Sequence, residues 1–573
     1  MRSFYHWLIP GAALLPLVSA MAEVPAYLNS NNVDNVLPSL DLSAERYQPS
    51  GARTSLPTRG QTQTLSSDTL IQLDNVLIEG GSVYPFDEIA APFSALIGKR
   101  VTLKQLAGLT GNITRRYKDD GYALSYAFIP AQNLSFGQVR IVLVEGYVAD
   151  HELRGDVGAV SELIRQFAAQ IVNERPLRRE TFERYTALMS QLPGVKVKTS
   201  APLPTTTDGA VTLIIEASRQ AVAVSSGLEL DNHDDVKLVV SAGLNSHTSA
   251  GEQVKVTTML PPGNDKERYA RIDYSQFVGD KGTRVNAFAS AYRSEKQELD
   301  ILGNIGSIDV KAQEERKNDR LSVGVTHPVK LTTRESLTAG GRIYAVNDER
   351  TFSVREPAAL AGTRAEISSQ VRAIALEGEW KLAEKDQLRI LSGGVYKGLD
   401  ILGADSEIRQ LDGSLNDDKD VDFLRFRIGG MQTNLFAERW QSVLSGAFYW
   451  SGDELPSSER AVFGSRSFGR GYPSDQAEGD RGWGLGYELG YRFYPQAHWL
   501  QLIQPYGALD TARASDNGNG GQDAELGSYA LGVRFSDQRH YNLTLEAARP
   551  FGDRAIDSGD RDPRFRFNVS YNL

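Results

Sequence analysis

Two patterns of hydrophobic positions divide the chain near residue 217. Before that point, apolar residues recur every three to four positions in segments that alternate with short strand-like runs. After it, apolar residues alternate one by one with small or polar residues, and turn-forming residues separate the runs. Helices produce the first spacing and half-buried strands the second. The pattern therefore predicts an N-terminal α+β region followed by an all-β region.

The α+β region contains the same order of elements twice. The order is β-α-α-β-β, first over residues 68–146 and again over 147–217, with the copies offset by about 75 residues, as in an array of small modules. Thr102 and Gln105 form a capping box at the start of one helix. The first copy predicts a strand over 70–78, helices over 86–96 and 103–119, and strands over 124–129 and 138–144. The second predicts a strand over 148–153, helices over 160–171 and 178–192, and strands over 195–199 and 211–217.

The all-β region, residues 218–573, alternates most clearly near its C-terminal end. In the segment 482–493 every second residue is aromatic or aliphatic, and the residues between them are mostly glycine. Segments 528–535, 541–547 and 565–573 alternate in the same way. A soluble β-sandwich would also alternate, but aromatic residues near strand ends and an even number of roughly sixteen strands favour a transmembrane barrel. A closed barrel leaves no strand edge exposed to lipid.

Composition agrees with a membrane barrel and narrows the function. Hydrophobic residues make up 41% of the chain, a low average that a barrel tolerates because only every second residue faces lipid. The net charge of −10 argues against a generic nucleic-acid binder. Cysteine is absent, so disulfides, thiolate nucleophiles and cysteine-based metal sites are excluded. The sequence contains neither a nucleotide-binding GxxxxGK[ST] motif nor an HExxH metal motif, and we expect no cofactor, no metal and no enzymatic activity.

The N-terminus has the features of a secretory signal peptide over residues 1–22. A positive Arg2 precedes a short apolar run, and Ala20-Met21-Ala22 provides small residues for cleavage. Residues 23–67 are rich in Asn, Ser, Pro, Thr and Gln, which predicts a linker with one short helical turn over 33–37 or a plug segment.

One local motif links this architecture to a known family. The segment Ser467-Phe468-Gly469-Arg470-Gly471-Tyr472 resembles the (V/I)RG(F/Y) motif at the tip of the long sixth loop in barrels that carry POTRA domains. Its Arg-Gly-Tyr core is kept, while Gly469 replaces the usual aliphatic residue. The loop would span about residues 451–481, a length typical of a functional loop. With the two β-α-α-β-β modules, the chain resembles the TpsB transporters of two-partner secretion over nearly its whole mature length.

The resemblance implies specific roles for several residues. In the family the loop arginine pairs with an aspartate on the thirteenth strand, in a motif of the form (F/G)xDxG. The matching residues here run from Ala508 to Ala512, which carries the pair over to Arg470 and Asp510. Alternation puts Asp510 on the lumen face, and Glu488 on the preceding strand is a plausible third partner. Gly471 and Tyr472 complete the loop motif.

A second and weaker group of candidates lies in the α+β modules. Gly121 and Tyr122 end a predicted helix, and Arg175, Arg178 and Arg179 begin another. The simpler interpretation is that Gly121 ends a helix and Tyr122 belongs to the core, while the three arginines lie at the solvated start of another helix. The alternative is that these residues contribute to a surface that docks the secreted partner.

The resemblance implies an outer-membrane transporter of a Gram-negative bacterium with periplasmic POTRA domains. It would recognise an unfolded exoprotein, of adhesin or haemolysin type, through the exoprotein's N-terminal secretion domain and pass it through the pore. Its other partners would be outer-membrane lipid or lipopolysaccharide and the barrel-assembly machinery. An outer-membrane protein insertase, which usually carries more POTRA copies, and a passive porin stay open as alternatives. An outer-membrane enzyme is a third alternative.

Overall fold

The computed structural model describes residues 53–55 and 70–572, apart from short gaps. The gaps are residues 233, 261–266, 306–307, 357–361, 363, 411–412, 417–418, 466–467, 474–475, 496, 519–522 and 556–557. Within these described residues, no helix combines the length and apolar character needed to cross a membrane. The predicted signal peptide, the helical turn over 33–37 and most of the predicted linker lie outside the described residues.

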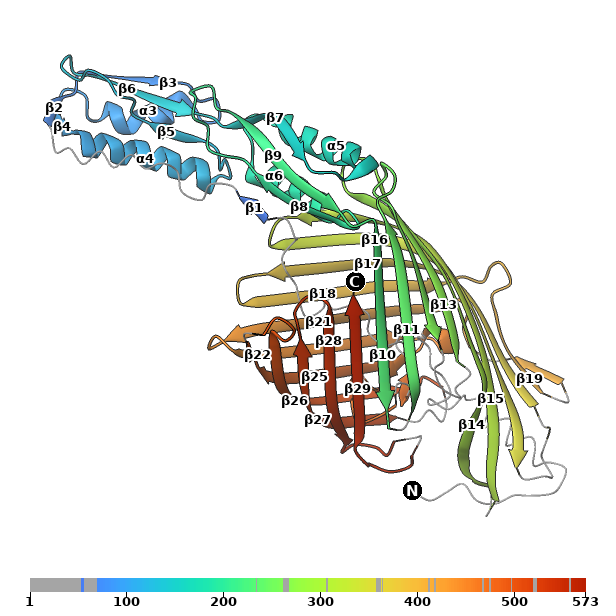
Figure 1. Cartoon of the computed structure of the whole chain (residues 1–573). Helices are drawn as coiled ribbons and strands as arrows, with labels where there is room; N and C mark the ends of the chain where they lie inside the picture. Colours follow the sequence, from blue (N-terminus) through green and yellow to red (C-terminus); the bar gives the residue numbers. More distant parts are fainter. Residues whose placement is uncertain are drawn as a thin grey trace.

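The first α+β domain has a three-stranded sheet packed against two helices (Figure 1). The capping box expected at α4 is present: Thr102 Oγ1 accepts from the N–H of Gln105, and the Gln105 side chain accepts from the N–H of Thr102. Leu106, Ile113 and Tyr117 of α4 are buried against the sheet. The sheet order is β3 (Asn75–Glu79), β6 (Gln138–Val144), β5 (Tyr126–Phe128), and the helices are α3 (Phe86–Ser94) and α4 (Leu103–Asp119).

The single strand predicted over residues 70–78 is wrong. The chain forms two strands there, β2 (Leu70–Gln72) and β3, and β2 pairs with β4 (Arg100–Thr102) outside the main sheet. Leu73 donates its N–H to the carbonyl of Lys99, and Asp74 donates its N–H to the carbonyl of Gly137. The backbone therefore changes partner between these two residues, a change that hydrophobic alternation cannot reveal.

The second α+β domain repeats this arrangement, with one additional strand. Its sheet has the order β1-β8-β9-β7, and β1 (Arg53–Ser55) comes from the predicted linker and pairs in parallel with β8. Its core includes Phe167 and Ile171 of α5 and Phe182 and Leu188 of α6. The remaining elements are β7 (Tyr147–Arg154), α5 (Ser161–Val172), α6 (Arg179–Ser190), β8 (Val195–Ser200) and β9 (Ala210–Arg219).

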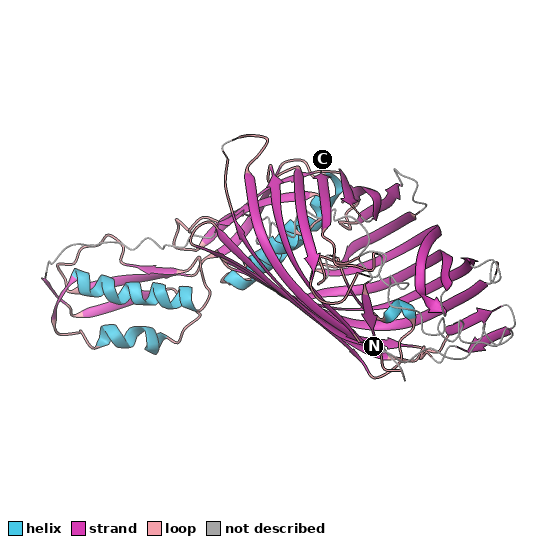
Figure 2. Ribbon diagram, turned by 90° about the horizontal axis from the view of Figure 1, so that it is seen from below, coloured by secondary structure: helices cyan, strands magenta, loops and turns pink. Residues whose placement is uncertain are grey.

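Sixteen antiparallel strands close into a barrel, which confirms the predicted fold class. Strands β14 to β17 are the longest, and Figure 1 shows them extending away from the α+β domains, with the hairpin β19 (Asp405–Gln410) and β20 (Gly413–Asn416) beside them. Figure 2 shows that the barrel wall is built of strands, whereas the long helices lie in the α+β domains. The barrel strands are β10 (Val222–Asp231), β11 (Asp234–Asn245), β12 (Gln253–Leu260), β13 (Arg268–Val278), β14 (Thr283–Ile305), β15 (Ile308–Leu331), β16 (Glu335–Glu356), β17 (Arg364–Ala383), β18 (Gln387–Gly398), β21 (Leu424–Phe436), β22 (Trp440–Ser451), β25 (Arg481–Tyr491), β26 (Leu502–Ser515), β27 (Ala524–Ser536), β28 (Tyr541–Pro550) and β29 (Arg564–Asn572).

The predicted alternation sorts the strand residues into an outer and a lumen face. On β25, Trp483 and Tyr487 are exposed on the outside, whereas Glu488 is buried on the inside. The first and last strands, β10 and β29, close the ring in antiparallel register and place Asp231 opposite Arg566. The seam of the barrel therefore carries a pair of opposite charges.

The second α+β domain and the barrel rim share one hydrophobic core. Phe277 at the end of β13 belongs to the same cluster as Phe167 of α5, with ring centroids 6.0 Å apart. The guanidinium of Arg284 on β14 donates to the main-chain carbonyl of Gln191 at 3.0 Å. Apolar packing and hydrogen bonds together fix this domain against one side of the rim.

Candidate functional site

The long segment between β22 and β25, here called loop 6, folds into the barrel. It contains a single helical turn, η4 (Ser457–Glu459), and a small hairpin formed by β23 (Ala461–Phe463) and β24 (Ala477–Gly479). Phe463 is almost completely buried in a cluster with Ala512 of β26 and Leu526 of β27. The hairpin therefore packs on the inner wall, and the Arg-Gly-Tyr motif lies between its two strands.

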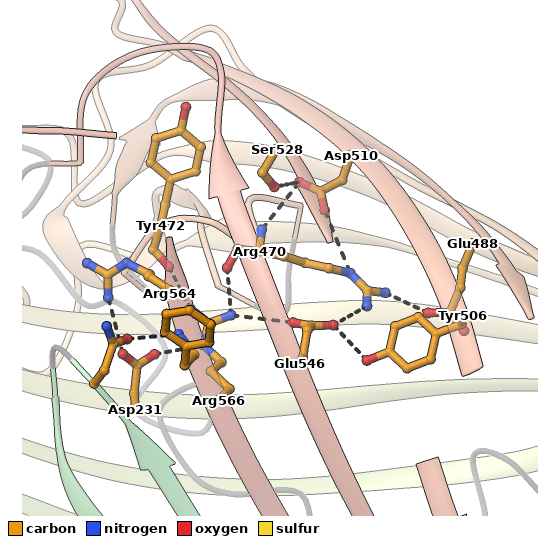
Figure 3. Close-up of polar contacts among 12 residues, drawn as sticks. Asp231, Arg470, Tyr472, Glu488, Tyr506, Asp510, Ser528, Glu546, Arg564 and Arg566 are labelled. Atoms are coloured by element: carbon orange, nitrogen blue, oxygen red, sulfur yellow. Dashed lines mark hydrogen bonds and ion pairs between the residues drawn. The ribbon is translucent and has the colours of Figure 1, made fainter. Parts of the chain in front are cut away.

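Arg470 lies at the centre of a group of lumen carboxylates (Figure 3). Its Nη1 is 2.7 Å from Glu546 on β28, and its Nη2 is 3.0 Å from Glu488 on β25. Its Nε is 3.7 Å from Asp510 on β26. A guanidinium suits this position because its fork can reach several acceptors at once.

Asp510, the predicted partner of Arg470, is hydrogen-bonded to the barrel wall and to the loop backbone. Its Oδ1 accepts the main-chain N–H of Arg470 at 3.3 Å and the hydroxyl of Ser528 at 2.6 Å. The structure thus brings together Arg470, Asp510 and Glu488, as the sequence suggested. The shortest ion pair of Arg470, however, is with Glu546, which the prediction had not selected.

A second arginine holds the main chain of the loop tip from the barrel seam. Arg566 on β29 donates from Nη1 to the carbonyl of Arg470 and from Nη2 to the carbonyl of Tyr472, both at 2.8 Å. Its Nε donates to Asp231 on β10, also at 2.8 Å. One side chain therefore connects loop 6 to both strands of the seam (Figure 3).

Gly471 and Tyr472 fit the tip closely against the wall. A Cβ added at Gly471 would lie 2.6 Å from the main-chain nitrogen of Pro550, so a larger residue would displace the loop. The Tyr472 side chain is completely buried, and its hydroxyl lies 3.0 Å from the carbonyl oxygen of Asp553. These contacts leave no space for a side chain at position 471 and bury the aromatic ring at position 472.

The deviation at Gly469 has a conformational explanation. Gly469 has a φ of 145°, a conformation that residues with a side chain rarely adopt. The preceding residue, Phe468, lies against Gly484 of β25, where an added Cβ would be 2.5 Å from the ring. Phe463 occupies the equivalent space above Gly482. The lumen glycines found in the sequence therefore accommodate aromatic rings of loop 6.

The base of loop 6 has anchors of its own. Glu459 pairs with Arg425 of β21 at 2.8 Å and accepts from the Tyr344 hydroxyl of β16 at 2.9 Å. Ser457 donates to the buried Asp348 of β16 at 3.1 Å. Loop 6 is thus held at its base on one side of the barrel and at its tip on the other.

No sequence feature distinguishes Glu546, Arg566 or Asp231 from the other lumen residues. Glu546 and Arg566 fall on the polar face of strands whose alternation was recognised, so their orientation could be read. Their partners could not, because the contacts join residues 76 and 96 positions apart along the chain.

Comparisons with known proteins agree with this architecture. Residues 71–146 match the model of the ShlB-type POTRA domain, and residues 359–535 match that of the haemolysin secretion/activation protein ShlB/FhaC/HecB. A heme/hemopexin transporter protein, HuxB, of Haemophilus influenzae is 22% identical over 83% of this chain and 82% of its own. Among solved structures, CdiB from Escherichia coli covers all of both chains with a TM-score of 0.68 and 16% identity. CdiB from Acinetobacter baumannii covers 98% of this chain and 97% of its own, with a TM-score of 0.56 and 13% identity.

Residues 71–146 and 359–535 thus carry the POTRA domain and the barrel region of a two-partner secretion transporter of the ShlB/FhaC/HecB type. The resemblance seen in the sequence is therefore confirmed. Members of this family are transporters rather than enzymes, so the alternatives of an insertase, a porin and an enzyme are set aside. We call the two α+β domains POTRA 1 and POTRA 2.

Four of the five weaker candidates form contacts across the junction between POTRA 1 and POTRA 2. The carbonyl of Gly121 accepts the N–H of Arg179 at 2.7 Å, and the Arg178 guanidinium lies 5.7 Å from the centre of the Tyr122 ring. Arg175 stacks over Tyr147 of POTRA 2, at 4.3 Å from the ring centre. The contacts of Gly121, Tyr122, Arg178 and Arg179 join the two domains, whereas Arg175 contacts a residue of its own domain, and a role of the five residues in docking a partner stays a prediction.

Proposed function

We propose that this transporter captures an unfolded exoprotein with its POTRA domains and passes it through the barrel as an extended chain. The observation that carries the proposal is loop 6, which is anchored inside the lumen of a barrel whose rim is joined to POTRA 2. A channel closed by its own loop needs that loop to move when a polypeptide passes. Loop 6, held by Arg470, Asp510 and Glu488, would then gate the pore.

The organisation that we propose follows the sequence analysis. Residues 1–22 are a signal peptide, 23–67 a linker or plug segment, 68–146 and 147–217 the two POTRA domains, and 218–573 the outer-membrane barrel. The POTRA domains face the periplasm of a Gram-negative bacterium, and lipid or lipopolysaccharide surrounds the barrel. The barrel-assembly machinery inserts it.

The cargo that we propose is a large extracellular protein of adhesin or haemolysin type, recognised through its N-terminal secretion domain. The family description names haemolysin, and the name of the Haemophilus influenzae relative refers to heme and hemopexin. Strand alternation places polar residues such as Gln504 and Ser528 on the lumen face of the wall, and a polar lumen would offer few binding sites to apolar cargo segments. Folding of the cargo outside the cell would supply the direction of transport.

Removal of a POTRA domain tests the proposal. Deletion of residues 70–146 removes POTRA 1 and, of the core shared by POTRA 2 and the barrel, only Leu124, so that Phe167 and Phe277 stay in place. We expect secretion of the exoprotein encoded beside this chain to stop while the barrel still folds in the membrane. Barrel folding is checked by electrophoresis of unheated samples. Secretion at the wild-type level would contradict the proposal.

A further inference from the structure

Strand addition to a POTRA sheet needs an edge with unpaired backbone groups, and four strands border the main sheets of the two domains when β1 is set aside. An extended peptide binds such an edge through main-chain hydrogen bonds, whatever its sequence. The edges are β3 and β5 in POTRA 1, and β7 and β8 in POTRA 2. Whether each edge is covered, irregular or already paired decides where the exoprotein of the proposed function could dock.

The β5 edge of POTRA 1 is closed by a side chain of its own helix. Thr114 of α4 accepts the N–H of Ala127 at 2.9 Å and donates to the carbonyl of Ala127 at 3.2 Å. Ala127 is the central residue of this three-residue strand. Its outward backbone groups are therefore satisfied, and an incoming strand would have to break these contacts.

The β7 edge of POTRA 2 is irregular and charged. The pairing of β7 with β9 shifts between Val148 and Asp150, and the strand continues with Glu152 and Arg154. Bulges and charged side chains are features that discourage pairing at an edge. This edge is a poor platform for an added strand.

The β8 edge already holds an extended segment. Arg53, Thr54 and Ser55 pair in parallel with Lys198, Thr199 and Ser200. The added segment covers three residues, whereas β8 has six. A longer strand could pair along all of β8 and form more hydrogen bonds than β1 does.

The β8 edge also leads directly to the barrel. The strand begins at Val195, and two residues earlier the carbonyl of Pro193 accepts the Ser246 hydroxyl of the rim at 2.7 Å. Figure 1 shows β1 and β8 beside the barrel, whereas β3 lies on the side of POTRA 1 away from it. A polypeptide paired with β8 would therefore lie close to the entrance of the pore.

We propose that the edge of β8 is the docking site for an extended segment of the exoprotein, and that residues 53–55 occupy this edge until the segment displaces them. The inference rests on the proposed function. It adds the site at which the exoprotein docks and the segment of this chain that competes for that site. The side chains of β8 alternate, with Val195 and Val197 buried and Lys196 and Lys198 exposed beside a groove of about 590 Å³ that Glu216 also lines. The segment that fits is an amphipathic strand with apolar residues on one face and polar or acidic residues on the other.

A reversible disulfide tests the exchange, because the chain has no cysteine of its own. In the double variant Arg53→Cys/Lys198→Cys the two positions are register partners. In the control Arg53→Cys/Lys196→Cys the second position is shifted by two residues, about 6.6 Å along the strand. We expect the registered pair to crosslink on oxidation, to lose secretion, and to recover secretion on reduction. We expect the shifted pair neither to crosslink nor to lose secretion. Failure of the registered pair to crosslink, or secretion at the wild-type level by the crosslinked protein, would overturn the inference.

A peptide measurement tests the edge without any exoprotein. The probe is a fluorescent peptide with the sequence of residues 50–58, added to the full-length protein in detergent. The variant Thr54→Pro/Ser55→Pro removes two successive main-chain N–H groups of β1, one of which faces β8, and we expect it to bind the peptide more tightly than the wild type does. Equal affinity would overturn the inference.

The two experiments separate the inference from the proposed function. If the wild type secretes the neighbouring exoprotein and the crosslinked variant does so equally, docking lies elsewhere, with β3 the next edge to test, and the proposed function stands. If the wild type does not secrete that protein, the proposed function fails. The crosslink and the peptide still report whether residues 53–55 occupy β8.

Discussion

The Arg566 guanidinium donates to the main-chain carbonyl of Arg470 at 2.8 Å, so two lumen arginines are direct neighbours. Their like charges are tolerated because Glu546 lies between them, 2.7 Å from Arg470 and 4.0 Å from Arg566. Arg566 also pairs with Asp231 on the first strand. The position of the loop tip and the closure of the barrel therefore depend on the same side chain.

Replacement of Arg566 should weaken both the anchoring of the loop tip and the closure of the barrel. The variant Arg566→Gln loses the ion pair with Asp231 and at least one of the two carbonyl contacts. Hydrogen bonds to charged groups contribute about 1.5–3 kcal/mol each, so we expect the folded barrel to convert to the unfolded form at a lower temperature. Electrophoresis after graded heating measures this temperature. Arg549→Gln, whose guanidinium contacts a carbonyl on the exposed surface, is the control, and an equal shift in both variants would contradict the prediction.

Replacement of Arg470 should release the loop tip. Alanine would leave Glu488, Asp510 and Glu546 without this cation, and loss of one partner from a buried pair typically costs about 3–5 kcal/mol. We expect a larger channel current in planar lipid bilayers for Arg470→Ala and an intermediate current for Arg470→Lys, because lysine lacks the fork. Arg409→Ala, at the exposed hairpin, serves as the control and should conduct like the wild type. Wild-type current in Arg470→Ala would refute the anchoring role.

The variant Gly471→Ala tests the fit of the tip without changing charge. The added Cβ would approach the main-chain nitrogen of Pro550 to 2.6 Å and the carbonyl carbon of Arg549 to 2.7 Å, and this backbone cannot give way as a flexible side chain could. We expect a current close to that of Arg470→Ala. Gly378→Ala adds the same methyl group to the wall, where the nearest atom is 3.8 Å away, and should behave like the wild type. Equal behaviour of the two glycine variants would show that the tip adapts.

The stability of POTRA 1 should depend on the ionisation of Glu145. Partial burial raises the pKa of this carboxyl, but hydrogen bonds from Ser82, Val83 and Tyr117 outweigh that effect and hold the pKa below its ordinary value. The contribution of Glu145 is therefore complete above the ordinary carboxyl pKa of about 4.3 and is lost as the pH falls through the lowered folded pKa.

We expect Glu145→Gln to lower the free energy of unfolding of residues 68–146 at pH 7 and to approach the wild type in acid. POTRA 1 has a hydrophobic core of its own, so urea unfolding followed by circular dichroism is suitable. Glu79→Gln, at a partly exposed position of β3, is the matched control. If Glu145→Gln and the wild type differed in free energy of unfolding by the same amount at pH 7 and at pH 3, the role assigned to the ionised Glu145 would be contradicted.

The candidate site could be predicted in part. The Arg-Gly-Tyr motif and its loop were recognisable because the residues are adjacent in the chain, and Asp510 and Glu488 could be placed on the lumen face by alternation. Glu546 and Arg566 satisfied the same alternation as many other lumen residues. Which of them meets Arg470 depends on the path of loop 6 inside the barrel and on the stagger of the strands.

The sequence by itself determined the two periodicities, and with them the POTRA modules, the barrel and the face on which each strand residue lies. These properties follow from local backbone geometry, which repeats every 3.6 residues in a helix and every two in a strand. Only the tertiary structure decided the partners of Arg470, the separation of β2 from β3 and the pairing of residues 53–55 with β8. Those features join segments far apart in the chain, and backbone hydrogen bonds at a strand edge depend little on side-chain identity, so no local pattern records them.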